Sequence, residues 1–472
     1  MLDEQHDILI STKQTENYLK EHGLKKVLQG VHLWAIGVGA LLSGVSFGLN
    51  QGMKGVGSLD FLVAMVVVTL FYGVLVLVFS ELATYLPYAG GPYAYARKGM
   101  GSFMGYMTGI LTIIEFLCAS AALTISIGLY FGQLIPSISP VVTTLLVYMI
   151  FFCVDMAGVR ISLVFQLAFT VIALSALIIF MLGVGPAVSI GNLLHNFQYA
   201  GEKGGILSAI PFAVMIYICI ESISLAAEET KNPDRAISFG FKSSMATVVV
   251  LSASIILLSV ASVDIGSFKY RGYSLEEILL MAQPDDAVLI TVFSTLTIGI
   301  LFASLHSLIY GLSRQLFSLS RAGYFPKFLS KIHKSAKTPH WAIITAGIVA
   351  MLLSYNMSMS GLLSVMGTSA ALMYIFILIS YLKIDMAGST VKRKILVWMA
   401  LAFGIGIFIL FVFQGYRELV PLFVGIVLSI IHYFVTGKDL IAEDAPEEIE
   451  AKVRKIKTSG MDKSGDQDEN KF

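Results

Sequence analysis

Long apolar segments recur along the whole of this 472-residue chain. A helix that crosses the ~30 Å hydrocarbon core of a bilayer needs about 20 predominantly apolar residues. About twelve segments meet this requirement, near residues 31–50, 60–84, 102–130, 140–157, 162–184, 207–227, 243–263, 287–318, 341–356, 361–382, 396–413 and 419–436. None alternates with the two-residue period of a membrane barrel strand. The sequence therefore predicts an all-α polytopic membrane protein with about twelve transmembrane helices.

Charged residues are too few for a water-soluble protein of this length. They make up 13% of the chain, against 56% hydrophobic residues, whereas a soluble domain carries roughly 25% charged residues. The net charge of +1 gives no basic footprint for nucleic acid. Cys118, Cys153 and Cys219 lie in apolar runs without the spacing of a disulfide framework or metal site. A soluble enzyme, a secreted scaffold and a nucleic-acid binder are all disfavoured, and no cofactor or metal is expected.

The distribution of Lys and Arg predicts the orientation in the membrane. Of the 32 Lys and Arg residues, 27 fall in the two ends and in the loops on their side. Cytoplasmic loops carry this excess, so both termini are expected in the cytoplasm and the protein in the plasma membrane. Residues 1–30 are polar, unlike a cleaved signal peptide, and should form a cytoplasmic arm. Residues 437–472 contain too little apolar surface to order, so we expect a disordered cytoplasmic tail.

The first span, WAIGVGALLSGVSFGLNQG, contains four glycines: Gly37, Gly39, Gly44 and Gly48. One interpretation is a helix that unwinds near Leu41, Leu42, Ser43 and Gly44 and so offers backbone groups to a substrate. The other is close packing of two helices through small residues four apart, which Gly44 and Gly48 fit. The pattern does not decide between the two.

The sixth span, IPFAVMIYICIESISLAAEE, is irregular in a different way. Pro211 lies near its start, and Glu221 lies in its middle beside Ser222 and Ser224. The first and sixth spans each open a set of five, so residues 31–184 and 207–382 are predicted to be two five-helix repeats, followed by two additional helices in 396–436. Paired broken helices at corresponding positions indicate the binding site of a transporter.

Two acidic residues lie deep in apolar spans, Glu115 in the third and Glu221 in the sixth. A charged side chain at the bilayer centre costs at least ~2.5–3.5 kcal/mol. No Lys or Arg lies deep enough in the first ten spans to pair with either. A cation from outside, namely an amine, a metal ion or a proton, would compensate them; the alternative is a protonated Glu hydrogen-bonded between helices. Glu81 and Asp155 lie near helix ends and are expected to be structural.

His306 is the only histidine well inside a span. It could relay protons, or it could be a packing histidine with satisfied ring nitrogens. Ser304 and Ser307 lie beside it and could line an ion site, although serines in membrane helices usually bond back to their own backbone. Possible coupling residues are therefore Glu115, Ser304, His306 and Ser307.

Four strings in order resemble the amino acid–polyamine–organocation permeases. They are GVGALLSG in the first span; ELATYLPYAGGPYAYARKGMG, residues 81–101, with Glu81, Gly90 and Gly91; AAEETKNPDRAI, residues 226–237, with Glu228, Asn232 and Pro233; and SRQLFSLSRAGYFPKFLSKIHKSAKTPHWAI, residues 313–343. HLWAIGVGALLSG, IIEFLCASA and AIPFAVMIYICIESISLAAEE are most similar to bacterial ethanolamine permeases. Three positions depart from the family pattern: Cys219 replaces a usual Gly, Ala322 replaces an acidic residue, and the fifth helix lacks the Lys of some proton-coupled relatives.

The resemblance implies a five-plus-five inverted repeat whose substrate binds halfway across the membrane, between helices one and six. We expect a secondary active transporter, not an enzyme, that imports a small organic cation, with ethanolamine as first choice, by alternating access. The alternative is a permease for neutral or cationic amino acids, either proton-coupled or an exchanger. The expected partners are this substrate, a coupling proton or cation and the lipid bilayer.

We also expect definite roles for residues at the site. Glu115 and Glu221 would balance an ammonium group, and the backbone at Leu41–Gly44 would receive a hydroxyl. Cys219 and Ile220 would shape the pocket, with Tyr217 as a lid.

Overall fold

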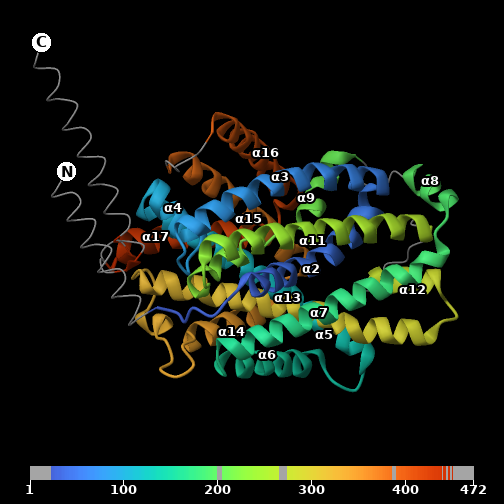
Figure 1. Ribbon diagram of the computed structural model, residues 1–472, viewed down its shortest axis with the longest axis horizontal. Coiled ribbons are helices and arrows are strands. Elements are labelled where there is room, and N and C mark those ends of the chain that lie inside the picture. Colours follow the sequence, from blue (N-terminus) through green and yellow to red (C-terminus); the bar gives the residue numbers. More distant parts are fainter. Residues whose placement is uncertain are drawn as a thin grey trace, which may run out of the picture.

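The computed structural model describes residues 23–198, 205–264, 274–384 and 390–437, and a few residues between 440 and 449. Residues 1–22 of the predicted cytoplasmic arm and most of the predicted tail lie outside the described residues. The described part is built of helices, which run beside one another along the long axis of the molecule (Figure 1). Its only β pairing is an isolated bridge between Leu28 and Thr230. The predicted all-α class is confirmed.

The helices follow the predicted spans closely. Before residue 200 the long helices are α2 (Gly30–Val56), α3 (Ser58–Tyr85), α5 (Ser102–Leu134), α6 (Pro140–Met156) and α7 (Val159–Val184), and the short ones are α4 (Pro92–Met100) and α8 (Ile190–Gln198). The second half contains α9 (Ile206–Val214), α10 (Ser222–Leu225), η2 (Ala227–Glu229), α11 (Pro233–Ser262), α12 (Ser274–Ala282), α13 (Ala287–Arg321), α14 (His340–Asn356), α15 (Met359–Lys383), α16 (Val391–Gly415) and α17 (Val420–His432).

The hydrophobic lengths of these helices suit a bilayer. Among the described residues, seven helices are long and apolar enough to cross a membrane, and four further apolar segments are shorter. Helices α5 and α15 are the most enclosed, with 83% and 78% of their apolar windows buried, whereas α16 buries only 33%. Helix α5 packs against both α13 and α15. The interior of the bundle therefore lies around α5, α15 and the half of α13 that follows Gly299, where nearly every residue is buried.

Helix α2 runs without interruption through Gly30–Val56, so the predicted break at Leu41–Gly44 is wrong. The structure shows instead the second interpretation of its glycines, close packing of two helices through small residues. A Cβ added at Gly44 would lie 2.0 Å from the backbone oxygen of Met215, and one at Gly48 would lie 2.9 Å from that of Phe212. The glycines therefore allow α2 and the sixth span to meet backbone to backbone.

Side chains from the helices around α2 bond to its backbone, so its N–H and carbonyl groups have partners although the helix does not unwind. The Ser43 N–H donates to Ser304 Oγ (3.2 Å), and the same hydroxyl donates to the carbonyl of Gly39 (2.7 Å). A hydroxyl from α13 is thus inserted between a donor and an acceptor four residues apart, which in an undisturbed helix bond to each other. The helix keeps its course because both groups remain satisfied.

The sixth span is broken, as predicted. Helix α9 ends at Val214, residues 215–221 form turns, and α10 begins at Ser222. Cys219 lies within the break at φ 68°, in the left-handed region where a side chain costs roughly 1–2 kcal/mol. Pro211 lies inside α9, four residues before the break, where it has no N–H to donate and its ring disturbs the turn that precedes it.

Candidate functional site

Three buried groups that can bind a cation converge at the break in the sixth span. Glu115 on α5, Cys219 in the break and Glu221 at its end each have a ligand atom within 4.8 Å of the others. The exposed fraction of both carboxylate residues is 0%. The Cys219 thiol donates a hydrogen bond to Glu115 Oε1 at 3.5 Å. The structure therefore brings Glu115 together with Cys219 and Glu221, which lie more than 100 residues further along the chain.

Each of the two carboxylates keeps one oxygen without a partner. The two carboxyl groups contact each other, but Glu115 Oε2 and Glu221 Oε1 are fully buried and accept no hydrogen bond from any other side chain among the described residues, while Glu221 Oε2 accepts one from the Tyr374 hydroxyl at 2.9 Å. Within the part of the chain that the structure describes, neither carboxylate forms an ion pair. Buried acceptors of this kind are costly unless they are paired. The arrangement can receive a cation with several donors, and the same three groups are those that could hold a metal ion.

A cluster of aromatic rings adjoins the carboxylate pair through Tyr374, whose hydroxyl bonds Glu221. Tyr72 on α3 lies between Tyr217 and Tyr374, with ring centroids 5.3 and 5.7 Å away, and Phe79 lies 6.2 Å from Tyr374. Aromatic faces attract ammonium groups, most strongly where water is excluded. Sequence reasoning missed Tyr72 and Tyr374, because a tyrosine in an apolar span carries no signal that separates a binding position from ordinary packing.

The remaining predicted substrate residues have the following positions. Leu41, Leu42 and Ser43 are buried within the continuous helix α2. Because the Ser43 amide already donates to Ser304, the expected role of the Leu41–Gly44 backbone in binding a hydroxyl is not supported. Ile220 is buried in the break, and Tyr217 is buried with its hydroxyl 2.8 Å from Thr69 Oγ1.

The predicted coupling residues on α13 bond to α2 and α7. Ser304 and Ser307 donate to the backbone oxygens of Gly39 and Ile36, at 2.7 and 2.9 Å, and not to their own helix. His306, only 2% exposed, contacts Gln166 through Nδ1 (2.6 Å) and Asp155 through Nε2 (3.0 Å). Asp155, which the sequence placed near a helix end as a structural residue, is therefore the partner of the buried histidine.

The predicted structural motifs meet at a junction beyond the end of the sixth span. Glu228 binds Arg321 through both carboxylate oxygens, at 3.0 and 2.9 Å, and accepts the backbone N–H groups of Leu24 and Ala89. Burial raises the pKa of the Glu228 carboxyl, and the Arg321 guanidinium together with the two N–H groups more than reverses this, so its pKa lies below the ordinary value. We call these four residues the Glu228 clamp. It joins the amino-terminal segment, the α3–α4 loop, η2 and α13.

The other motif residues shape neighbouring turns. Gly90 and Gly91 lie against α13 and α10, since an added Cβ would lie 2.3 Å from Ser318 Oγ and 2.5 Å from Ser224 Oγ, respectively. Asn232 adopts the left-handed conformation immediately before Pro233, which begins α11.

Glu81 joins α3 to two further helices. It accepts a hydrogen bond from the Tyr381 hydroxyl at 2.6 Å and forms an ion pair with Arg393 at 2.5 Å.

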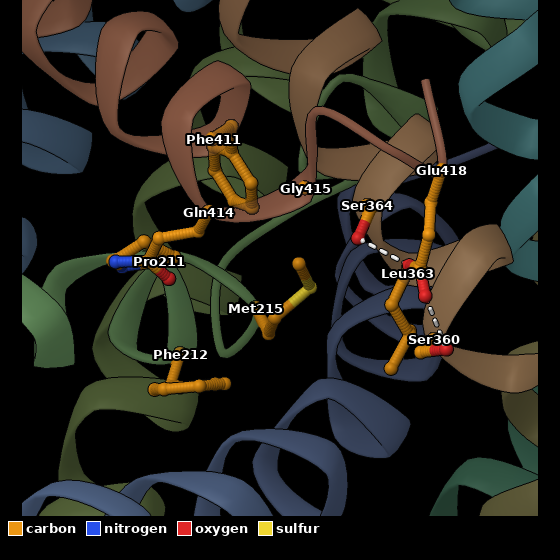
Figure 2. Close-up of a pocket in the computed structure, with 10 residues that line it drawn as sticks. All are labelled: Pro211, Phe212, Met215, Ser360, Leu363, Ser364, Phe411, Gln414, Gly415 and Glu418. Atoms are coloured by element: carbon orange, nitrogen blue, oxygen red, sulfur yellow. Dashed lines mark hydrogen bonds between the residues drawn. The ribbon is translucent and has the colours of Figure 1, made fainter. Parts of the chain in front are cut away.

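A pocket of about 230 Å³ lies next to α9, the first helix of the broken span (Figure 2). Its lining comes from α9, α15, α16 and the residues that follow: Pro211, Phe212, Met215, Ser360, Leu363, Ser364, Phe411, Gln414, Gly415 and Glu418. Glu418 accepts hydrogen bonds from Ser360 (2.8 Å) and Ser364 (3.1 Å). Met215 is the first residue of the turns that carry Cys219 and Glu221, so the pocket adjoins the broken segment.

Comparison with solved structures supports the fold. The chain is similar to a Na⁺-coupled sialic acid symporter solved in a substrate-bound outward-open state, with a TM-score of 0.55 over 84% of this chain and 93% of the other, at 12% identity. At that identity the similarity concerns the fold alone.

Curated relatives share more of the sequence. The branched-chain amino acid permease BcaP of Bacillus subtilis (strain 168) is 24% identical over 71% of this chain and 75% of its own length. The low-affinity putrescine importer PlaP of Escherichia coli (strain K12) is 26% identical over 70% of this chain and 74% of its own. An uncharacterised transporter of Rhizobium meliloti (strain 1021) is 26% identical over 75% and 77%. The profile of the family described as amino acid permease matches residues 31–443. The chain therefore belongs to the amino acid permease family of multi-pass membrane transporters and is not an enzyme.

Proposed function

We propose that this transporter for amino acids or organic cations imports a small organic cation, with ethanolamine as the first choice. The observation that carries the proposal is the pair of buried carboxylates, Glu115 and Glu221, each with one unpaired oxygen and neither with a basic partner among the described residues. An ammonium group offers several N–H donors and a positive charge, which are the two things that this pair lacks.

The geometry also suits the rest of a short amino alcohol. The Tyr374 hydroxyl bonds Glu221 and its ring packs against that of Tyr72, so an ammonium group bound at Glu221 would have aromatic rings nearby. The Ser222 hydroxyl, next to Glu221 in the chain, is buried without a hydrogen-bond partner. It replaces the α2 backbone as the group that would meet the substrate hydroxyl.

An amino acid is the second candidate, since the family and the relative BcaP are named for amino acid transport. An amino acid carboxylate needs N–H donors, which the end of a broken helix supplies. Helix α2 is not broken, and its Ser43 amide already donates to Ser304. The sixth span is broken, but the N–H groups at the start of α10, from Ser222 to Leu225, already donate to backbone oxygens of residues 219–221. This observation favours an amine without a carboxylate.

The proposal includes a location and an orientation. The excess of Lys and Arg in the loops that share a side with both ends supports a plasma-membrane protein with cytoplasmic termini. Alternating access would carry the substrate past the broken sixth span, from one side of the membrane to the other.

Uptake and counterflow in proteoliposomes test the proposal. The panel contains labelled ethanolamine, putrescine, leucine and lysine, each at several concentrations. Ethanolamine is expected to exchange saturably, and Glu221→Gln and Glu115→Gln to abolish the exchange, because each removes one charge of the pair. Glu276→Gln is the matched control, since Glu276 bonds Ser294 on α13 and takes no part in the site. Full-rate exchange by both site variants would refute the charge-balance argument, and exclusive exchange of leucine or lysine would favour an amino acid permease.

A further inference from the structure

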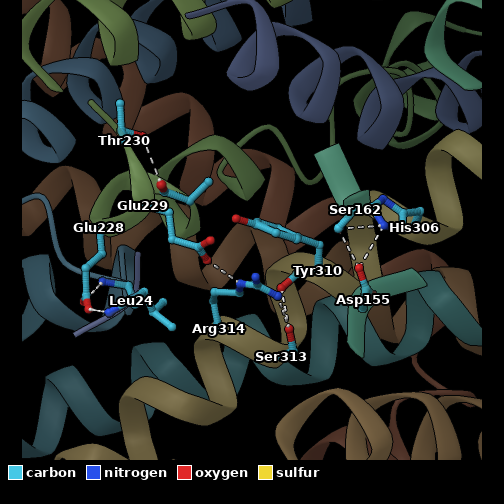
Figure 3. A network of polar contacts seen from close by, with 12 residues as sticks. Leu24, Asp155, Ser162, Glu228, Glu229, Thr230, His306, Tyr310, Ser313 and Arg314 are labelled. Carbon is cyan, nitrogen blue, oxygen red and sulfur yellow. Dashed lines mark hydrogen bonds and ion pairs between the residues drawn. The ribbon is translucent and has the colours of Figure 1, made fainter. Parts of the chain in front are cut away.

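A second buried network links a titratable pair to helix α2. His306 on α13 lies 3.0 Å from Asp155 Oδ1 and 3.1 Å from Ser162 Oγ through its Nε2, and 2.6 Å from Gln166 Oε1 through its Nδ1. Figure 3 shows the imidazole pointing at Asp155 and Ser162. All four side chains are at most 2% exposed. The network lies apart from Glu115 and Glu221, and no step of the proposed substrate binding uses it.

The amide of Gln166 is oriented by the backbone that it contacts. Its Nε2 lies 3.1 Å from the carbonyl oxygen of Ala35 on α2 and 3.2 Å from that of Ala303 on α13. Carbonyl oxygens only accept hydrogen bonds, so the NH₂ group must face them. Gln166 Oε1 therefore faces His306 as an acceptor, and the Gln166 side chain holds α2 against α13.

Both ring nitrogens of His306 consequently face acceptors. Nδ1 faces the amide oxygen of Gln166, and Nε2 faces the carboxylate of Asp155, to which Ser162 also donates at 2.6 Å. A neutral imidazole has one N–H donor, whereas the imidazolium has two. The observed contacts are therefore those of a His306–Asp155 pair that carries a proton.

Loss of that proton must break one side of the network. A hydrogen bond to an ionised carboxylate is the stronger of the two, so the nitrogen that faces Asp155 keeps its hydrogen and Nδ1 loses one. Two lone pairs then face each other across the 2.6 Å between His306 and Gln166. Rotation of the Gln166 amide removes this repulsion, but it turns Oε1 toward Ala35 and Ala303 and breaks both bonds that join α2 to α13.

The surroundings leave Asp155 as the counter-charge of His306. The elements packed around the imidazole contribute the rings of Phe151 on α6 and Phe165 on α7, with centroids 5.9 and 5.2 Å away. On α13 itself the charged group nearest along the chain is Arg314, which acts electrostatically on Asp155. Arg314 already pairs with Glu229 of η2 at 2.8 Å. From α2 the network meets only backbone oxygen.

We infer that the His306–Asp155 pair binds the proton that drives transport. Gln166 is the positioning residue, because its amide holds α2 in place only while the pair carries the proton. Proton loading holds α2 against α13, and proton release frees α2 to move. The inference rests on the proposed function for the identity of the substrate, but the proton site itself stands on the geometry of the network.

The first test is pH-driven accumulation in proteoliposomes with the membrane potential clamped at zero. One proton carried with each substrate gives about tenfold accumulation for an alkaline interior of one pH unit, since tenfold corresponds to about 1.4 kcal/mol. For each variant, pH-driven accumulation is divided by its rate of counterflow. We expect Asp155→Asn and His306→Gln to lower this ratio to the value that the wild type shows without a pH gradient. His432→Gln, the same change at a histidine that contacts Tyr106, is expected to keep the wild-type ratio. An undiminished ratio in both network variants overturns the inference.

The second test needs no substrate. Hydrogen–deuterium exchange of peptides covering residues 35–43 of α2 is followed across roughly pH 5 to 9, the range in which histidine pairs titrate, and corrected for intrinsic rates. In the wild type, these amides are expected to lose protection from exchange in a single transition as the pH rises. In Asp155→Asn, no such transition is expected. A wild type without this transition overturns the inference. If no compound of the panel exchanges, the proposed function fails, and this measurement alone decides the proton site.

Discussion

Glu228→Gln tests how firmly the Glu228 clamp holds the structure together. Glu228 is 3% exposed and accepts four N–H bonds, two from Arg321 and one each from Leu24 and Ala89. Glutamine has the same shape but only one side-chain oxygen. Its NH₂ group would face the Arg321 guanidinium and a backbone N–H, so two of the four bonds are lost and a buried guanidinium loses its counter-charge.

The expected loss of stability follows from these contacts. Hydrogen bonds to charged groups contribute about 1.5–3 kcal/mol each, so two lost bonds amount to about 3–6 kcal/mol. Removing one partner of a buried ion pair costs about 3–5 kcal/mol, which agrees. We therefore expect the free energy of unfolding to fall by about 3–5 kcal/mol, with a melting temperature lower by about 3–5 °C.

Thermal unfolding of the purified protein in detergent measures this effect. The control is Glu418→Gln, the same change at a partly exposed carboxylate that accepts hydrogen bonds from two serines, where about 1 kcal/mol or less is expected. Equal melting temperatures for the two variants would refute the argument that the buried charge of Glu228 stabilises the folded protein.

The pH dependence of the same variant has a definite sign. Because the folded pKa of Glu228 lies below its ordinary value of about 4.3, its carboxylate contributes stability above that value and loses the contribution as the pH falls through the folded pKa. The difference in melting temperature between wild type and Glu228→Gln should be constant near neutral pH and shrink below about pH 4. A difference that grows on acidification would contradict the assignment.

Three further substitutions probe the site and its packing. Gly44→Ala places a methyl group 2.0 Å from a backbone oxygen of the sixth span, so we expect stability to fall by about 1–3 kcal/mol and uptake to be impaired. The control is Gly73→Ala, which has open space around it and should be neutral or slightly stabilising. Cd²⁺ should block substrate exchange by the wild type, because it can bind the Cys219 thiol together with the carboxylates of Glu115 and Glu221. Cys219→Gly should resist this block, whereas Cys153→Ser, at an exposed thiol, should remain sensitive. Tyr374→Phe removes one hydrogen bond to a carboxylate and should weaken substrate binding by roughly 10-fold, measured by competition, and unchanged binding would exclude that hydrogen bond from the site.

Hydropathy and buried charge were sufficient to predict most of the architecture. The apolar lengths located the spans because lipid imposes a minimum length on each crossing. Pro211 and the mid-span Glu221 located the break in the sixth helix, because both features are tolerated only where backbone or charge meets protein or water. The convergence of Glu115 with Glu221 was anticipated for the same reason: neither carboxylate had a basic partner nearby in sequence.

The course of the first span depended on contacts that the sequence does not display. Its glycines fit both an unwound helix and a tightly packed one. The outcome is set by Ser304 and Ser307, more than 250 residues away, which bond to the backbone of α2. Tyr72 and Tyr374 were missed because their role follows from their place beside Glu221, and their residue type alone does not reveal it.

The sequence also underestimated Asp155. Its position near the end of a span suggested an interfacial role, but it forms a buried pair with His306 on a helix more than 140 residues away. Pairing between distant helices is fixed by how the bundle closes, and that information is absent from local hydropathy.

The hydroxyl of Ser304, which sits between the Ser43 N–H and the Gly39 carbonyl, makes separation of α2 from α13 inexpensive. When the two helices part, the amide and the carbonyl can bond directly to each other, as in any uninterrupted turn. Detachment at this point is then an exchange of partners that leaves no backbone group of α2 stranded in a dry interior. In a carrier that works by the proposed alternating access, such a contact is specific when it is made and costs little free energy when it is released.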